Sequence, residues 1–414
     1  MKPRKKFIIV VSNYYIGGIE VLVQRLSSVL QKNYKVYVFI LTSKVDINLL
    51  KELDKVATVY LPSDFIKFKL GIINIIGVNS ILSVKSKYRD LISEADYIHA
   101  TDSHTMVFII SILGKFDTAH KFSVGNYHSE EFLWSSSWWF RRFEKQLIKD
   151  FTPENVFSEN KIMINKLVNA HGKKFVRSNE MPAGIHLPNI PNSGTFHLRE
   201  NKLVCMGRLV KFKSYMEYVI KEIPKILLEF PAFEFHIYGD GPERENLQKL
   251  SQNLPVYFHG TIELKNIPKV LSSFKLFIGS GTSIVTASAL GIPSIIGIES
   301  SKSSITYGFL HEVTDYDYNE LGLDYQTVSI SEKVIEGLKA TNKEYQLLCE
   351  LAREKSEEFC ITKTAKILET TPSLQIKSKF SILQRYRYFC SVFTWTLLNK
   401  LNILSTKKTR HYLK

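Results

Sequence analysis

The first half of the chain alternates short apolar runs with segments of helical period. In one of these segments, residues 17–30, Leu22, Leu26 and Val29 fall on one helical face. The apolar runs that we expect to form strands are FIIVVS (7–12), KVYVFIL (35–41), ATVYL (57–61), DYIHAT (96–101) and KFSVGNYH (121–128). Strands separated by helices in this rhythm pair in parallel through crossover connections. The pattern therefore predicts an open α/β domain.

The same rhythm restarts in the second half, after a segment rich in Pro and Gly that interrupts regular structure. The strands expected there are KLVCMG (202–207), FEFHIYG (233–239), VYFHG (256–260), KLFIGS (275–280) and PSIIGI (293–298). We therefore expect two Rossmann-like, doubly wound α/β domains facing each other across a cleft, where ligands bind beyond the carboxyl ends of the strands. The expected division is a first domain over residues 1–185, a linker over 186–200, a second domain over 201–370 and a tail over 371–414.

Length and composition fit two globular domains. The chain has 414 residues, of which 44% are hydrophobic and 23% charged, so each half is long enough to bury its own core. The four cysteines show neither a CxxC pair nor metal-ligand spacing with histidines, which favours a reducing compartment. The sequence contains no run of 18 or more apolar residues, so no membrane-spanning helix is predicted. The net charge of +15 implies an anionic partner such as nucleic acid, a phosphorylated substrate or an anionic membrane.

One turn suits an anionic ligand. The strand expected at residues 275–280 leads into Gly281, Thr282 and Ser283 and then into a predicted helix. Glycine lets a ligand approach the backbone, and a helix that starts there presents free N–H groups. The spacing completes neither a dinucleotide-binding fingerprint nor a Walker A loop. On its own the turn is equally well explained by close packing at a strand-to-helix corner.

A basic loop follows the first strand of the second half. It carries Arg208, Lys211 and Lys213. A guanidinium and an ammonium group suit a diphosphate on which negative charge grows, and a solvated basic loop is the alternative. After the next strand come Gly239 and Gly241, which fit either a close-approach turn or a plain strand-to-helix connection.

In their order along the chain, these elements resemble the second domain of GT-B glycosyltransferases, particularly the retaining, nucleotide-sugar-dependent family 4, the glycosyl transferases group 1. The resembling positions, over most of residues 200–300, are Gly207, Arg208, Leu209, Lys213, Gly239, Asp240, Gly241, Pro242, Phe258, Gly260, Ala287, Gly291 and Pro293. The resemblance implies that the second domain binds a nucleotide-sugar donor and that Arg208 and Lys213 are catalytic. The donor-binding residues that it implies there are Gly207, Gly239, Gly241, Gly281, Thr282, Ser283 and Thr286.

The first half resembles the family more loosely, and the resemblance implies an acceptor-side domain. Its Gly17 and Gly18 resemble the family's first glycine loop and are expected near the donor phosphates. His128 follows a strand at a place where relatives often have a histidine beside the transferred sugar, so a catalytic role is implied; an ordinary polar residue at a strand end is the alternative. Secondary candidates for the acceptor side are His99, Asp102 and His104.

The sequence departs from the family pattern at its two acidic positions. Relatives carry two glutamates separated by seven residues, and the second grasps the ribose hydroxyls; here the positions hold Ile278 and Thr286. A threonine makes hydrogen bonds but not the charge-assisted bonds of a carboxylate. Three explanations are altered nucleotide recognition, a divergent subgroup that relies on its Gly-Ser-Gly-Thr turn, and an inactive relative. The retained cations favour the second explanation.

The tail has an amphipathic pattern. Its apolar stripe, at spacings of three and four, comprises Ile382, Tyr386, Phe389, Phe393, Leu397, Leu401 and Leu404, and basic residues surround it. One interpretation is a helix folded back on the core. The other, favoured by the net charge, is an interfacial anchor formed by residues 378–414 on an anionic membrane.

The resemblance implies a hexosyltransferase-type enzyme that moves a sugar from a nucleotide diphosphate to a glycan or lipid-linked acceptor, with retention. We expect it to need no metal or other cofactor and to act in bacterial surface polysaccharide synthesis, peripherally on the cytoplasmic face of the inner membrane. The alternatives are an inactive GT-B relative that serves as a glycan- or nucleotide-binding scaffold, a nucleotide-sugar epimerase of the same fold, and a nucleic-acid-binding protein. The last has no zinc spacing, recognition helix or RNP motif to support it, so nucleic acid is not an expected partner.

Overall fold

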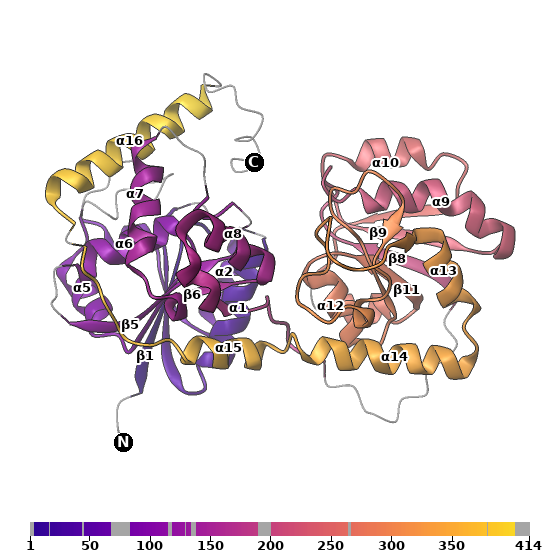
Figure 1. Ribbon diagram of the computed structural model, residues 1–414, viewed down its shortest axis with the longest axis horizontal. Coiled ribbons are helices and arrows are strands. Elements are labelled where there is room, and N and C mark those ends of the chain that lie inside the picture. The colour runs from indigo at the N-terminus through magenta and orange to yellow at the C-terminus, as the bar shows by residue number, and fades with distance from the viewer. Residues whose placement is uncertain are drawn as a thin grey trace. The chain divides into compact units, whose positions relative to one another are not determined.

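The computed structural model divides the chain into two compact units, Met1–Pro182 with Thr364–Lys414, and Ala183–Lys363 (Figure 1). The residues that the structure describes are 4–15, 17–43, 45–67, 83–114, 118–128, 130–133, 138–188, 200–263, 266–378 and 380–401. Most of the expected linker, residues 189–199, lies outside this described part, as does Leu404 of the expected stripe.

The first unit is built on an eight-stranded sheet. Its strands are β1 (Lys5–Val11), β2 (Tyr34–Ile40), β3 (Thr58–Tyr60), β4 (Tyr97–Ala100), β5 (Ala119–Asn126), β6 (Val156–Ser158), β7 (Asn179–Glu180) and β15 (Leu374–Gln375). The parallel strands follow the order β3-β2-β1-β4-β5-β6-β7, and β15 pairs antiparallel with the start of β5. Five consecutive residues of β1, Phe7–Val11, are buried, as a strand covered on both faces requires.

The helices of the first unit connect these strands and cover the sheet. They are α1 (Gly18–Leu30), α2 (Ile47–Asp54), α3 (Pro62–Phe65), α5 (Ser86–Ser93), α6 (Ser103–Leu113), α7 (Trp139–Leu147), α8 (Lys161–His171), α15 (Ile361–Glu369) and α16 (Ile382–Lys400), with 3-10 turns at Ile148–Asp150, Pro153–Asn155 and Lys173–Arg177. In α1, Leu22 and Leu26 of the expected face are buried together with Leu30. The chain passes from the second unit to the first within α15.

The second unit contains a five-stranded parallel sheet. Its strands are β8 (Glu200–Met206), β9 (Glu234–Tyr238), β10 (Val256–Gly260), β11 (Phe274–Gly279) and β12 (Ser294–Ile296), in the order β10-β9-β8-β11-β12. The chain runs outward from β8 to β10 and then returns to build β11 and β12 on the other side of β8. The strand order therefore reverses between β8 and β11, and in open α/β sheets such a switch point is where ligands bind.

Helices cover both faces of this sheet. They are α9 (Tyr215–Glu229), α10 (Arg244–Leu250), α11 (Ile267–Leu271), α12 (Thr282–Ala289), α13 (Ile330–Lys339) and α14 (Asn342–Glu357), with a 3-10 turn at Leu310–Glu312 and a two-stranded antiparallel sheet of β13 (Ile305–Thr306) and β14 (Val328–Ser329). Leu203 and Cys205 of β8 pack with α9, α10 and α13, whereas Val204 packs with α11 and α12. This alternation confirms the doubly wound α/β architecture expected from the sequence.

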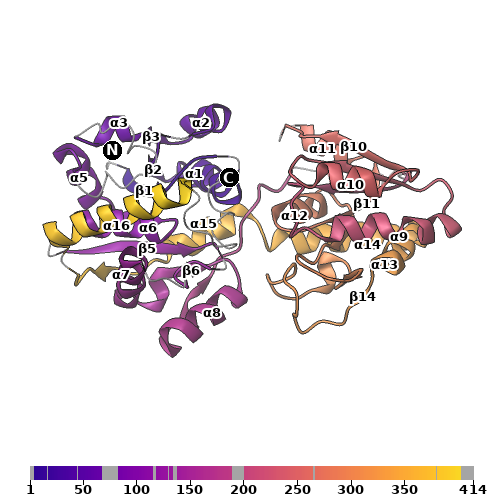
Figure 2. The same ribbon diagram turned by 90° about the horizontal axis from the view of Figure 1, so that it is seen from above.

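The last helix, α16, packs on the first unit across α6 and α7 (Figures 1 and 2). Tyr388, Val392 and Thr396, one helical turn apart, form its buried face. The Tyr388 hydroxyl donates to the buried Glu144 carboxylate of α7 at 2.5 Å. One face of the expected tail is therefore folded back on the core. None of the helices in the described part of the chain is long and apolar enough to cross a membrane.

Candidate functional site

The loop after β8 brings two cations to the switch point. Arg208 is exposed immediately beyond the strand, and among the described residues no carboxylate pairs with it. Lys213, half-buried, lies at the end of the loop, just before α9. Its ammonium lies against Gly207, since a Cβ added to Gly207 would stand 3.0 Å from Nζ. Glycine at position 207 thus leaves the ammonium in place, where a larger side chain would displace it.

Burial and two charged neighbours set the electrostatics of Lys213. Burial lowers the pKa of its ammonium below the ordinary 10.5, while the carboxylate of Glu299 raises the pKa and the guanidinium of Arg208 lowers it further. A half-desolvated cation gains more from an anionic ligand than a fully solvated one. A bound phosphate would therefore stabilise the charged form of this lysine.

Gly239 and Gly241 have a packing role in this loop. A Cβ on Gly239 would overlap the carbonyl oxygen of Gly207, and one on Gly241 would overlap that of Leu209. The two loops are joined by backbone hydrogen bonds, among them Leu209 N–H to the Asp240 carbonyl at 2.9 Å. Close packing is thus a sufficient reason for both glycines, and their contact with a donor stays a prediction.

The turn after β11 presents an uncapped helix end. Gly281 has φ +62° and ψ −151°, a conformation that is essentially restricted to glycine, and a Cβ there would meet open space. No side chain caps the first turn of α12, which begins at Thr282. The Ser283 hydroxyl donates to the Ser280 carbonyl, and the Tyr318 hydroxyl donates to the Gly281 carbonyl. The turn is thereby held rigid while its amide groups stay available to an anion.

At positions 278 and 286, where the family has glutamates, the residues of this chain do not offer another polar group to a donor. Ile278 is fully buried in the core of the second unit. Thr286 donates its hydroxyl to the Thr282 carbonyl at 2.8 Å, within α12. A carboxylate nevertheless lies at this edge of the sheet: Glu299, after β12, accepts a hydrogen bond from the Ser280 hydroxyl at 2.6 Å. Glu299 was not expected from the sequence, although it follows a predicted strand directly.

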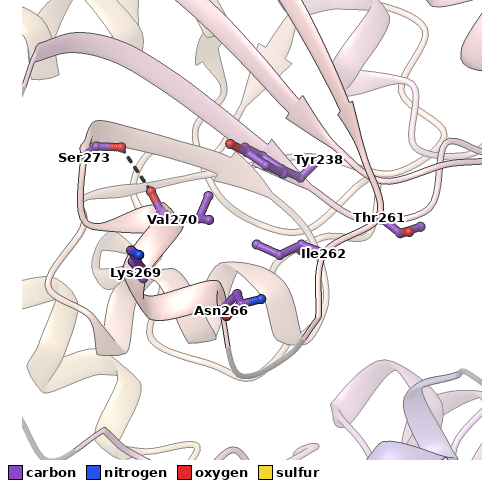
Figure 3. A pocket seen from close by; sticks show the side chains of 7 residues that line it. All are labelled: Tyr238, Thr261, Ile262, Asn266, Lys269, Val270 and Ser273. Atoms are coloured by element: carbon purple, nitrogen blue, oxygen red, sulfur yellow. Dashed lines mark hydrogen bonds between the residues drawn. The ribbon is translucent and has the colours of Figure 1, made fainter. Parts of the chain in front are cut away.

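A pocket of about 560 Å³ lies beside the ends of β9 and β10 (Figure 3). The residues that line it are Tyr238, Thr261, Ile262, Asn266, Lys269, Val270 and Ser273. One face of the Tyr238 ring stacks on His259, with ring centroids 4.4 Å apart and planes 13° apart. An aromatic ring, an amide and hydroxyl groups around a space of this size suit a flat, polar ring. Neither Tyr238 nor this pocket was expected from the sequence.

In the first unit, Gly17 and Gly18 begin α1. Gly17 is the N-cap residue in extended conformation, without a side-chain cap. A Cβ on Gly18 would meet open space, whereas one on Gly17 would overlap the carboxylate of Glu20. The first turn of α1 is thus already covered by an acidic side chain. The negative charge of Glu20 beside Gly17 opposes a phosphate at this position.

His128 lies two residues beyond β5. Its Nδ1 accepts a hydrogen bond from the Glu130 amide at 3.1 Å, so the neutral ring carries its proton on Nε2. Burial lowers the pKa of the imidazole below its ordinary value of 6.5. His128 is therefore a neutral side chain at pH 7, suited to hydrogen bonding rather than to charge stabilisation.

The three secondary candidates are engaged inside the first unit. Both ring nitrogens of His99 are occupied, by the Ser123 hydroxyl at 2.9 Å and the Tyr127 hydroxyl at 2.8 Å, and burial lowers its pKa to about 3. Asp102 caps α6, and His104 bonds to the Tyr388 hydroxyl. These contacts give each residue a structural role. In the described part of the chain, no group of three or more His, Cys, Asp or Glu side chains could hold a metal ion.

Comparison with solved structures shows which class of fold this is. HepE from Anabaena, solved in complex with UDP and glucose, is 15% identical, with a TM-score of 0.58 over 89% of this chain and 99% of that one. TarM is 12% identical, with a TM-score of 0.59 over 88% of this chain and 99% of that one. WaaG, a glycosyltransferase involved in lipopolysaccharide biosynthesis, is 12% identical, with a TM-score of 0.53 over 88% of this chain and all of that one. The chain thus has the fold of the GT-B glycosyltransferases.

The sequence of the second unit matches one family of glycosyltransferases. Residues 200–306 match the family model of the glycosyl transferases group 1. This range contains the loops after β8, β9, β10, β11 and β12. The resemblance to that family, inferred above from Arg208, Lys213 and the glycines, is thereby confirmed over this range. A comparison with curated proteins gave no significant match.

Proposed function

We propose that the protein is a glycosyltransferase that moves a hexose from a nucleotide diphosphate to a hydroxyl group of a glycan or lipid-linked acceptor, with retention of configuration. The observation that supports the proposal is that Arg208 and Lys213 follow β8 and the uncapped α12 follows the neighbouring strand β11, at the switch point of a sheet that matches the family model. Relatives of the same fold have been solved with UDP-glucose or act in lipopolysaccharide synthesis, which favours bacterial surface polysaccharide as the product.

The donor would lie across the carboxyl edge of the second unit. The nucleobase enters the pocket against Tyr238, and the diphosphate meets Arg208, Lys213 and the amide groups of α12. These fixed positive groups stabilise the negative charge that grows on the leaving diphosphate, so the reaction needs no metal ion. Retention follows when the acceptor oxygen attacks the anomeric carbon from the side that the phosphate leaves. The carbon–phosphate oxygen bond breaks, and the acceptor proton passes to the departing phosphate oxygen.

The test of this function is the effect of single cation deletions on turnover. We expect Arg208→Ala to lower kcat by about 100-fold or more, because it removes a charge that acts on the leaving group. Lys211→Ala is the matched control, since Lys211 is an exposed lysine of the same loop and should leave turnover unchanged. The measurement is release of nucleotide diphosphate from a panel of nucleotide sugars with purified protein. Equal activity of Arg208→Ala and wild type would remove this arginine from the mechanism.

A second candidate function is that of an inactive relative that binds a nucleotide or glycan. The observation that favours it is the burial of Ile278 and the internal hydrogen bond of Thr286, which leave both acidic positions of the family without a carboxylate. An inactive relative would be stabilised against heat by a nucleotide sugar but would not release the diphosphate from it.

We further propose that the protein docks on an anionic membrane surface, and that α16 carries the contact. Although one face of α16 is buried, Ile382, Tyr386, Leu397 and Leu401 of the expected stripe are 73%, 56%, 45% and 58% exposed. Apolar and aromatic side chains exposed along one helix, in a chain with a net charge of +15, suit the headgroup region of an anionic bilayer. This docking would bring the enzyme to a lipid-linked acceptor.

A further inference from the structure

Glu299 contacts the uncapped turn before α12 through the Ser280 hydroxyl. It follows β12, the strand that pairs with β11. The backbone around it is fixed at two points: its own amide donates to the Asn319 carbonyl at 2.7 Å, and the next amide, of Ser300, donates to the Phe212 carbonyl at 2.6 Å. The second contact ties the segment to the loop that carries Lys213. Glu299 is therefore held in place by backbone contacts before any ligand binds.

Within the described part of the chain, one oxygen of this carboxylate forms a hydrogen bond and the other forms none. Oε1 accepts the hydrogen bond of the Ser280 hydroxyl, and the buried Tyr215 hydroxyl lies 3.4 Å from the same Ser280 oxygen. Among the described residues, none forms a hydrogen bond with Oε2. A carboxylate oxygen accepts two hydrogen bonds, so Oε2 is an available acceptor on a half-buried, oriented side chain.

Charge decides which part of a donor can approach Glu299. The carboxylate acts electrostatically on Lys213, although the two groups form no direct ion pair. A phosphate is attracted by Lys213 and repelled by Glu299, whereas an uncharged hydroxyl group can donate a hydrogen bond to the carboxylate. The anionic part of a donor therefore belongs on the lysine side and a hydroxyl-bearing part on the Glu299 side.

The strand order decides which hydroxyl groups these are. The features of the site follow the strand order β10-β9-β8-β11-β12. The pocket lies at β10 and β9, and after it come the cations that follow β8, the turn that follows β11 and Glu299, which follows β12. With strands about 4.8 Å apart, these five strands span roughly 19 Å. The ribose lies between base and diphosphate, while the transferred sugar lies beyond the diphosphate. Glu299 is on the far side of the diphosphate from the pocket, on the side of the transferred sugar.

We propose that Glu299 binds a hydroxyl group of the transferred sugar through Oε2 and so determines which sugars this protein accepts. The carboxylate comes from the segment after β12 instead of from position 278 or 286, which explains how a donor sugar is held where both family acids are missing. This inference rests on the proposed function, because it presumes a nucleotide-sugar donor.

The experiment compares two ligands on two variants by calorimetry. The ligands are a nucleotide sugar that binds the wild type and the nucleotide diphosphate that corresponds to it. We expect Glu299→Gln to weaken binding of the nucleotide sugar about tenfold or more, because a hydrogen bond to a charged group is lost. Binding of the diphosphate should be unchanged or tighter, since a nearby negative charge is removed. Glu245→Gln, an exposed glutamate of α10, is the matched control and should change neither.

A donor analogue identifies the hydroxyl group involved. Of a set of deoxy-sugar donors, the one that lacks the contacted hydroxyl should bind wild type and Glu299→Gln equally. If Glu299→Gln weakens binding of the nucleotide diphosphate as much as binding of the nucleotide sugar, Glu299 organises the phosphate site. If Glu299→Gln and the wild type bind the nucleotide sugar equally, Glu299 makes no contact with the sugar. Either result overturns the inference. If the wild type binds no nucleotide sugar of the panel, the proposed function itself fails. Thermal unfolding of each variant verifies that it is folded.

Discussion

Burial of Lys213 predicts how activity depends on pH. Because its pKa lies below that of an ordinary lysine, the ammonium loses its proton at a lower pH, and kcat/KM should fall as the pH rises through this value. Glu299 raises the pKa, so Glu299→Gln should move the alkaline limb to still lower pH. The measurement is a profile of kcat/KM against pH for both proteins. If the alkaline limb lies at the same pH in the wild type and in Glu299→Gln, the charge of Glu299 does not raise the pKa of Lys213.

The backbone of Gly281 predicts a paired effect on stability and binding. Gly281→Ala forces an alanine into a conformation that alanine rarely adopts, so we expect the free energy of unfolding to fall by about 1–3 kcal/mol. Distortion of the turn should also weaken binding of a nucleotide diphosphate. Urea unfolding and calorimetry measure the two effects.

The control for this change is Gly18→Ala. A Cβ there also meets open space, but Gly18 is the first residue of a helix, where alanine is favoured by up to about 1 kcal/mol. Gly18→Ala should therefore be as stable as the wild type or more stable. If Gly281→Ala behaves like Gly18→Ala, the strain assigned to position 281 is absent.

Single residues differ in how far the sequence predicts them. The place of Arg208 and Lys213 just after a strand is predicted from the sequence, because that spacing is local information, and their catalytic role stays a prediction. The proximity of Glu299 to Ser280 is not predicted, because it arises only when β12 pairs with β11. His99 shows the opposite error: the sequence shows a polar residue at a strand end, whereas the fold buries it between two hydroxyl groups.

Among the elements, α16 is attached to α6 and α7 by several contacts, of which the buried hydroxyl group of Tyr388 is one. The Tyr388 hydroxyl donates to Glu144, which is 1% exposed, and also contacts His104. Tyr388→Phe leaves the buried carboxylate with one partner fewer, so we expect the free energy of unfolding to fall by about 1–3 kcal/mol. Urea unfolding of the full chain measures it. Tyr386→Phe, on the exposed face of the same helix, is the control, and an equal effect of both changes would refute a specific role of Tyr388.

Long elements follow from the sequence, and very short ones follow only where they lie within a longer apolar run. The runs at residues 7–12, 35–41 and 202–207 correspond to β1, β2 and β8 because each is apolar enough to be buried on both faces. The strands β3 and β12 were predicted because they lie within longer apolar runs, whereas β6, β7 and β15 were missed, since two or three residues without such a run carry no periodicity. Their existence depends on edges that the longer strands provide. The amphipathic pattern of the tail predicts the helix, but its buried face is set by the partners in α6 and α7.

At the scale of the whole molecule, charge and exposed apolar surface predict binding to membranes. We expect the 414-residue chain to sediment with vesicles of phosphatidylcholine and phosphatidylglycerol at low salt, and much less with pure phosphatidylcholine, because a net charge of +15 is attracted to anionic lipid. Raising the salt concentration should weaken binding through screening.

The part that α16 plays is tested by removing its exposed apolar side chains. The double change Tyr386→Ser and Leu397→Ser should lower the vesicle partition coefficient about tenfold or more, because two side chains that would enter the headgroup region are lost. The matched control is Leu228→Ser on α9. Leu228 is 83% exposed, and this substitution, like the double change, leaves the net charge unchanged. Equal loss of binding in both proteins would mean that the contact is not made by α16. Unchanged binding of the double variant, with its salt dependence retained, would mean that charge alone attracts this protein to the membrane.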